Sequence, residues 1–131
     1  MALQSRPLSP HLQIYRLPLT VVLSISHRIT GAFLGLGALM FVVMLAAAAA
    51  GPDSYASVHG LVAAWYGQLL AFLFTFALFF HFCNGIRHLA WDMGYGFEYA
   101  TTHNTAVIAL GASAALTLLL WIVAIAAGWG A

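Results

Sequence analysis

The sequence contains very little charge. Only 5% of its 131 residues are charged, whereas soluble domains carry roughly 25%. Lysine is absent, and four arginines against three acids give a net charge of +1, which offers no argument for binding nucleic acid or a strongly anionic partner. Hydrophobic residues make up 63% of the chain. These proportions predict an integral membrane protein whose surface contacts the lipid bilayer.

Cysteine is almost as scarce. Cys83 is the only one, which excludes an internal disulfide, a zinc site built from cysteine pairs and an iron-sulfur cluster held by this chain alone. Residues 1–10 also lack the apolar core of a signal peptide and the arginine- and serine-rich pattern of a transit peptide. We therefore expect the first membrane helix to direct insertion, with the amino terminus retained.

Three long segments carry no charge, namely residues 29–50, 61–80 and 106–128. Each reaches the roughly 20 residues that a helix needs to cross the hydrocarbon core of a bilayer. Because a helix can extend beyond an uncharged run, the sequence predicts membrane helices over about 21–50, 61–90 and 105–128. The predicted fold is all-α, a single membrane-anchor domain over residues 1–131 with three transmembrane helices.

The segments beside these spans are predicted to be irregular. Prolines at positions 7, 10 and 18 interrupt any helix in residues 1–20, which we expect to form an interfacial arm. The sequence G-P-D-S after residue 50 favours a short turn-rich loop over residues 51–60. Arginine occurs only before the first uncharged run and after the second, so the positive-inside rule places the amino terminus and the 88–104 connection in the cytoplasm.

The end of the second span carries an unusual density of ionisable groups. His81, His88 and Asp92 follow one another closely there, and such groups at the edge of hydrocarbon mark a functional site by default. Helical spacing places Ala77 and Gly85 one turn on either side of His81. An imidazole between two small residues could bind the iron of a flat macrocycle, or it could hydrogen-bond a neighbouring helix across a close-packing face.

The chain offers no second histidine at the depth of His81 in the membrane. His11, His59 and His103 fall in the arm or in connections and are interpreted as ordinary surface residues. A haem iron with two protein ligands would therefore take its second ligand from another polypeptide. This predicts that the chain is part of a hetero-oligomeric helix bundle.

A second polar cluster lies where the first span begins. Ser24 and Arg28 are one helical turn apart, with His27 and Thr30 close by. A hydroxyl and a guanidinium side by side can donate hydrogen bonds to the carbonyl of an uncharged ring or to a carboxylate. The alternative is an arginine that only anchors the helix among lipid head groups.

Asp92 and Glu98 are the only acids on the predicted cytoplasmic face. They could relay protons to a ligand that is being reduced. They could also form a solvated loop in which they pair with Arg87. The residue pattern alone leaves both interpretations open.

Two motifs match a known family. The first reads R-P at residues 6–7 and S-x-x-H-R-x-T at residues 24–30, and the second reads H-x-x-x-G-I-R-H-L-x-W-D-x-G at residues 81–94. Together with the three predicted spans, these motifs closely resemble the large cytochrome b subunit of succinate dehydrogenase. The match covers the arm, the start of the first span and the end of the second, and the arm resembles that of bacteria close to the mitochondrial lineage.

The resemblance implies a multi-pass anchor in the bacterial inner membrane. Such an anchor shares one haem b with a second, small anchor subunit, below an iron-sulfur subunit and an FAD flavoprotein subunit on the cytoplasmic side. It takes part in electron transfer from succinate to ubiquinone and has no dehydrogenase active site of its own. The resemblance leaves the physiological direction open, because fumarate reduction depends on the quinone and on other subunits.

The resemblance also implies roles for residues near the haem. His81 matches the axial ligand of the haem iron, and His27 and Arg28 match residues near the haem propionates. His88 lies in the same motif without one agreed role, and we group it with the haem-binding residues.

For the quinone site, the resemblance implies a role for Ser24 and Arg28. Asp92, and more loosely Glu98, match acids proposed to lead protons inward. No position of either motif departs from the family pattern, and the polar pair Cys83-Asn84 falls on positions that the pattern does not constrain.

Two other functions compete with an electron-transfer anchor. A scaffold that only tethers soluble subunits would have no need of His81 between small neighbours. A transporter or channel would need polar residues through the membrane midplane of more than one span, and only a few offer themselves: Gln68, Thr75, Ser113 and Thr117. A reduced-minus-oxidised spectrum of the purified complex separates the first two possibilities, because it reports haem directly.

The arginine asymmetry gives a topological prediction. With three spans and the amino terminus inside, a reporter fused after Ala131 should lie on the periplasmic side. An alkaline phosphatase fusion, active only in the periplasm, and a green fluorescent protein fusion, fluorescent only in the cytoplasm, measure this from both sides. A fluorescent fusion without phosphatase activity would reject the topology.

Overall fold

The structure is a computed structural model that describes residues 16–128. It consists of α1 (Leu19–Ala50), α2 (Pro52–Ala63), α3 (Trp65–Asp92) and α4 (Tyr99–Ala126), and the described part of the chain contains no strand. α1, α3 and α4 are each long and apolar enough to cross a membrane. The predicted all-α membrane protein with three long apolar helices is confirmed, while most of the predicted arm, residues 1–15, lies outside the described residues.

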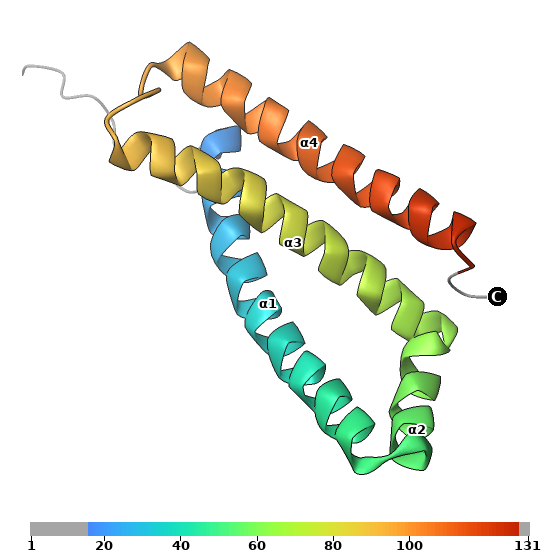
Figure 1. The fold of residues 1–131 in the computed structure, drawn as a ribbon. Helices are drawn as coiled ribbons and strands as arrows, with labels where there is room; N and C mark the ends of the chain where they lie inside the picture. Colours follow the sequence, from blue (N-terminus) through green and yellow to red (C-terminus); the bar gives the residue numbers. More distant parts are fainter. Residues whose placement is uncertain (1–15, 129–131) are drawn as a thin grey trace, which may run out of the picture.

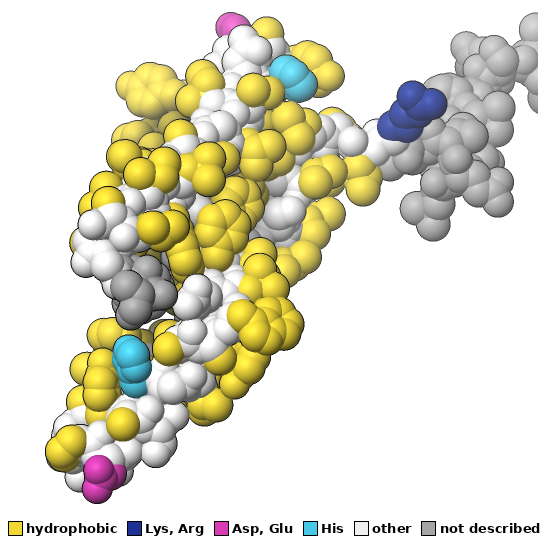
Figure 2. All heavy atoms as spheres, turned by 90° about the vertical axis from the view of Figure 1, so that its right-hand side faces the viewer, with side chains coloured by type: hydrophobic (Ala, Val, Ile, Leu, Met, Phe, Trp, Pro, Cys, Tyr) yellow, Lys and Arg dark blue, Asp and Glu magenta, His cyan; other side chains and the backbone are white. Residues whose placement is uncertain are grey.

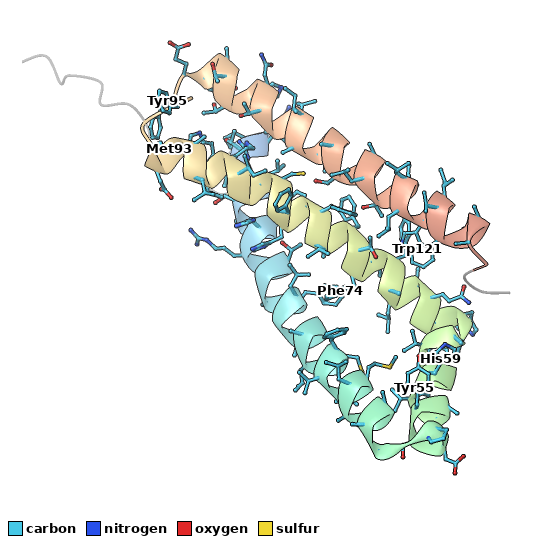
Figure 3. The ribbon with its side chains drawn as sticks, viewed as in Figure 1. Tyr55, His59, Phe74, Met93, Tyr95 and Trp121 are labelled. Atoms are coloured by element: carbon cyan, nitrogen blue, oxygen red, sulfur yellow. The ribbon has the colours of Figure 1, made fainter. Side chains whose placement is uncertain are left out.

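α3 is the central helix of the bundle. It packs along α4 on one side and against α1 on the other, whereas α1 and α4 contact each other only slightly (Figure 1). α1 lies close to the carboxyl-terminal half of α3 and diverges from it beyond Phe74, whose ring is 6.0 Å from that of Phe33 (Figures 1 and 3). The start of α1, the end of α3 and the start of α4 therefore meet at one end of the molecule.

The bundle buries very few side chains. The buried apolar residues are Leu23, Ala47, Ala77, Phe80, Ala106 and Ala109. Many large hydrophobic side chains are exposed, and on the face seen in Figure 2 charged side chains lie only near the two ends. A groove of about 410 Å³ between α1, α3 and α4 is also mainly apolar. Such surfaces are stable against lipid tails or other membrane helices rather than against water.

The expected turn-rich loop over residues 51–60 is wrong, because most of this segment belongs to α2. Pro52 stands at the first helical position and Asp53 lies in the first turn, and both favour the beginning of a helix. α2 ends before the extended residue Ala64, and α3 starts directly after it. A Cβ at Gly67 would overlap the carbonyl oxygens of Leu61 and Val62, so the close return of the chain at this break needs glycine.

Candidate functional site

Three histidines from two helices meet near the end where α1 begins and α3 ends. The rings of His27 from α1 and His81 from α3 are stacked, with centroids 3.8 Å apart and planes 13° apart. His88, two turns after His81, lies 5.0 Å from the His27 ring and 5.0 Å from Trp91. The structure thus brings together the three histidines that the sequence motifs single out. His59 is exposed beside Tyr55 on α2, at the other end of the bundle (Figure 3).

The hydrogen bond of His81 defines how its ring can act. Its Nδ1 atom lies 3.0 Å from the backbone carbonyl oxygen of His27. A carbonyl oxygen only accepts, so Nδ1 carries the proton and donates it. The hydroxyl oxygen of Thr30 lies 3.3 Å from the same nitrogen. In the neutral imidazole the lone pair is then on Nε2, the atom that remains for a metal or another donor.

Small residues of both α1 and α3 lie near the His27 and His81 rings. Gly85 faces the His27 ring, since a Cβ there would lie 3.8 Å from Cε1 of His27, and Ala77 is buried. The glycine that approaches the His81 ring is Gly31 of α1, where a Cβ would lie only 2.9 Å from Cε1 of His81.

The remaining candidate residues surround this cluster. Ser24 is half-buried and Arg28 exposed on α1, one turn apart as predicted. Asp92 is the last residue of α3 and Glu98 directly precedes α4, and both are exposed. The two acids therefore lie in the 92–98 connection, at the same end of the bundle as His88.

Arg87 does not pair with either acid, contrary to one of the two interpretations of this segment. Its side chain is only 7% exposed and bonds to oxygen atoms of three residues. Nε donates to the Thr105 hydroxyl at 3.3 Å, one terminal nitrogen donates to the Thr102 carbonyl at 3.1 Å, and the other donates to Asn84 Oδ1. The guanidinium also lies 4.7 Å from the Trp91 ring centroid, a cation–π geometry.

Asn84 is the main residue that sequence reasoning missed. It is fully buried, and its amide nitrogen donates to the Leu23 carbonyl of α1 at 3.2 Å while its oxygen accepts from Arg87. Asn84 and Arg87 stand three residues apart on one helical face, and this spacing was the available signal. Position 84 is one of the unspecified positions of the motif at residues 81–94, so this residue links α1 to the arginine without belonging to the motif.

Comparison with known proteins decides the family. Residues 2–120 match the family model described as succinate dehydrogenase/fumarate reductase transmembrane subunit. The chain belongs to this family. It is 40% identical over 119 residues to the succinate dehydrogenase cytochrome b556 subunit of Paracoccus denitrificans, which covers 91% of this chain and 92% of that protein. As a member of the succinate dehydrogenase/fumarate reductase transmembrane subunits, the chain is a membrane subunit of an oxidoreductase complex with a role in electron transport.

Two further relatives align with this chain over a similar share of its length. The cytochrome b560 subunit of Reclinomonas americana is 39% identical over 124 residues, which span 91% of this chain and 86% of that protein. The cytochrome b556 subunit of Rickettsia felis is 39% identical over 118 residues, which span 89% and 91%. The resemblance to succinate dehydrogenase cytochrome b subunits that the sequence motifs indicated is confirmed.

The Arg87 network predicts a stability defect. Arg87→Lys keeps the charge, but one ammonium cannot reproduce a planar group that donates to acceptors on both sides. Loss of a hydrogen bond to a charged group costs about 1.5 to 3 kcal/mol, so we expect a lower unfolding temperature of the detergent-solubilised complex. Arg16→Lys is the matched control, because Arg16 is exposed. Equal unfolding temperatures for the two variants would contradict the structural role of Arg87.

Proposed function

We propose that this chain is the haem b-binding membrane anchor of succinate dehydrogenase and forms part of its ubiquinone reduction site. In this proposal residues 1–131 act as one anchor domain without a dehydrogenase active site of its own. The observation that carries the proposal is the hydrogen bond from Nδ1 of His81 to the His27 carbonyl. It occupies Nδ1 and leaves the basic Nε2 nitrogen to bind a ligand, as expected for a histidine that ligates iron.

The residues around His81 fit a haem. His27 Nδ1 is buried and has no hydrogen-bond partner among the described residues, so the site has capacity for one more polar group. A haem propionate has suitable chemistry, because its carboxylate accepts hydrogen bonds from imidazole and guanidinium groups. We assign His27, Arg28 and His88 to this group and His81 to the iron. A bound haem b supplies a reversible one-electron couple.

The second iron ligand is proposed to come from the small anchor subunit. Among the described residues, no histidine besides His27 and His88 lies near His81. His27 is on α1 and His88 on α3, and their rings are 5.0 Å apart. The splayed helices and the apolar groove between α1, α3 and α4 leave room for helices of such a partner. One shared haem b would then join the two anchor subunits.

Ser24 and Arg28 are the proposed quinone ligands on this chain. Both are accessible on α1, one turn apart, and both donate hydrogen bonds. Reduction of ubiquinone to ubiquinol takes up two electrons and two protons, and donors at the carbonyl oxygens favour the charge that develops there. Asp92 and Glu98 are exposed in the connection at this end of the bundle and are proposed to conduct the protons.

The orientation of the complex follows from the arginine distribution. We propose a multi-pass subunit of the bacterial inner membrane with the amino terminus and the 92–98 connection in the cytoplasm. The iron-sulfur and FAD flavoprotein subunits would bind on that side, at the end of the bundle where the histidines lie. Electrons from succinate would then enter next to the proposed quinone site.

The quinone assignment is tested with Ser24→Ala. Loss of one neutral hydrogen bond is worth about 0.5 to 1.5 kcal/mol, so quinone reduction should slow roughly two- to tenfold. Succinate oxidation with a soluble acceptor should stay unchanged, because that reaction needs no quinone site. Ser57→Ala, an exposed serine on α2, is the matched control. If both activities of Ser24→Ala fall equally, the defect lies in assembly and the assignment is wrong.

The haem assignment is tested with His81→Ala. Removal of one axial ligand should make the haem high-spin or cause its loss from the assembled complex. The reduced-minus-oxidised spectrum and the low-temperature EPR signals measure this directly. His103→Ala, which removes an exposed histidine of α4, should retain the wild-type spectrum. An unchanged low-spin b-type spectrum in His81→Ala would reject His81, and His88 would be the next candidate.

A further inference from the structure

The orientation of His81 is set by the neighbouring helix. Three groups of α1 surround its ring: the carbonyl of His27 accepts from Nδ1 at 3.0 Å, the Thr30 hydroxyl oxygen lies 3.3 Å from Nδ1, and Gly31 approaches Cε1. We call these three groups the α1 cradle. The Thr30 hydroxyl itself is held by the Ser26 and His27 carbonyls at 2.9 and 3.0 Å, so its oxygen has a fixed position.

Gly31 determines how closely the α1 cradle approaches the ring. A Cβ at this position would lie 2.9 Å from Cε1, 3.6 Å from Nδ1 and 3.9 Å from Nε2 of His81. A separation below 3.0 Å is closer than carbon atoms tolerate, so a methyl group would displace either the ring or the helix. The His81 ring cannot move freely, because its Nδ1 atom is hydrogen-bonded to the His27 carbonyl and the His27 ring is stacked on its face.

Of the α1 glycines, Gly31 is the one that approaches His81, whereas a Cβ at Gly37 would meet the Phe74 ring instead. At Gly35, one turn further along α1, a Cβ would meet no atom within 4 Å. All the atoms that a Cβ at position 31 would meet within 4 Å belong to His81, so the imidazole is what requires glycine there. The contact involves the edge of the ring between the hydrogen-bonded nitrogen and the nitrogen that remains for a ligand.

We propose that Gly31 is a positioning residue for His81. Because Gly31 has no side chain, the α1 backbone can approach the edge of the ring, and the hydrogen bond from Nδ1 to the His27 carbonyl can form. This hydrogen bond fixes the tautomer of His81 and the direction of Nε2. Donation from Nδ1 makes Nε2 a stronger electron donor, so the same contact adjusts the bond to a metal. This inference rests on the proposed ligand role of His81.

The spectroscopic test compares Gly31→Ala with Gly35→Ala in the assembled complex. Both variants add one methyl group to α1 and raise its helix propensity equally. Gly31→Ala should shift the low-spin EPR signals and the midpoint potential of the haem or convert part of it to high-spin, whereas Gly35→Ala should match the wild type. Unchanged signals and potential in Gly31→Ala would overturn the inference.

A double-mutant cycle keeps the test decisive where Gly31→Ala assembles poorly. Alanine at position 81 removes the ring that the new methyl group would meet, so Gly31→Ala should cost much less stability or assembly in a His81→Ala background. An equal loss in both backgrounds would show that the methyl group meets something else, and it would overturn the inference.

The two proposals fail in different ways. An unchanged low-spin spectrum in His81→Ala removes the ligand role and with it the reason for positioning. Loss of the low-spin spectrum in His81→Ala together with a wild-type spectrum in Gly31→Ala overturns only the role of Gly31. The double-mutant cycle reads stability and assembly, so its result does not depend on turnover of the enzyme.

Discussion

A buried arginine without an acidic partner constrains this protein more than any other group. Arg87 is almost inaccessible, and a charge near the hydrocarbon is costly unless oxygen atoms surround it. The oxygen atoms come from α3 and α4, and Asn84 extends the same set of bonds to the α1 backbone. Three helices are thereby joined at one end, in a molecule that otherwise buries few side chains.

The polar network and the histidine cluster occupy the same part of α3. Asn84 and Arg87 point toward α1 and α4, while His81 and His88 lie close to His27 of α1. Residues that join the helices and histidines available for chemistry therefore lie within the same two turns of α3. A membrane subunit of an electron-transport complex needs this combination, because ligands for a cofactor must stay in place within a bundle that has little core of its own.

Sequence patterns predicted the long elements well, because an uncharged apolar run of about 20 residues is seldom anything but a membrane helix. They predicted the ends less well. α4 begins at Tyr99, whereas the predicted span begins near residue 105, since a polar first turn can be helical without being apolar. α2 was missed because Gly51-Pro52 was interpreted as a turn, although proline also suits the first turn of a helix.

The candidate site was predicted residue by residue, but its contacts were not. Motif spacing identified His27, His81 and His88 without showing that two of the rings are stacked. Two of the three partners of Arg87 lie 15 and 18 residues away on α4, beyond what helical periodicity relates. Gly31 could not be distinguished from Gly35 by sequence alone, since the difference depends on which side of α1 faces the imidazole.

The short helix α2 gives the molecule a triangular frame. α1 and α3 converge at the histidine end and diverge toward the opposite end, where α2 connects them (Figure 1). At a rise of about 1.5 Å per residue the 12 residues of α2 form a strut about 18 Å long. A triangle with three stiff sides has a fixed apex angle. The length of α2, at the end of the molecule opposite His81, is therefore one determinant of the angle between α1 and α3.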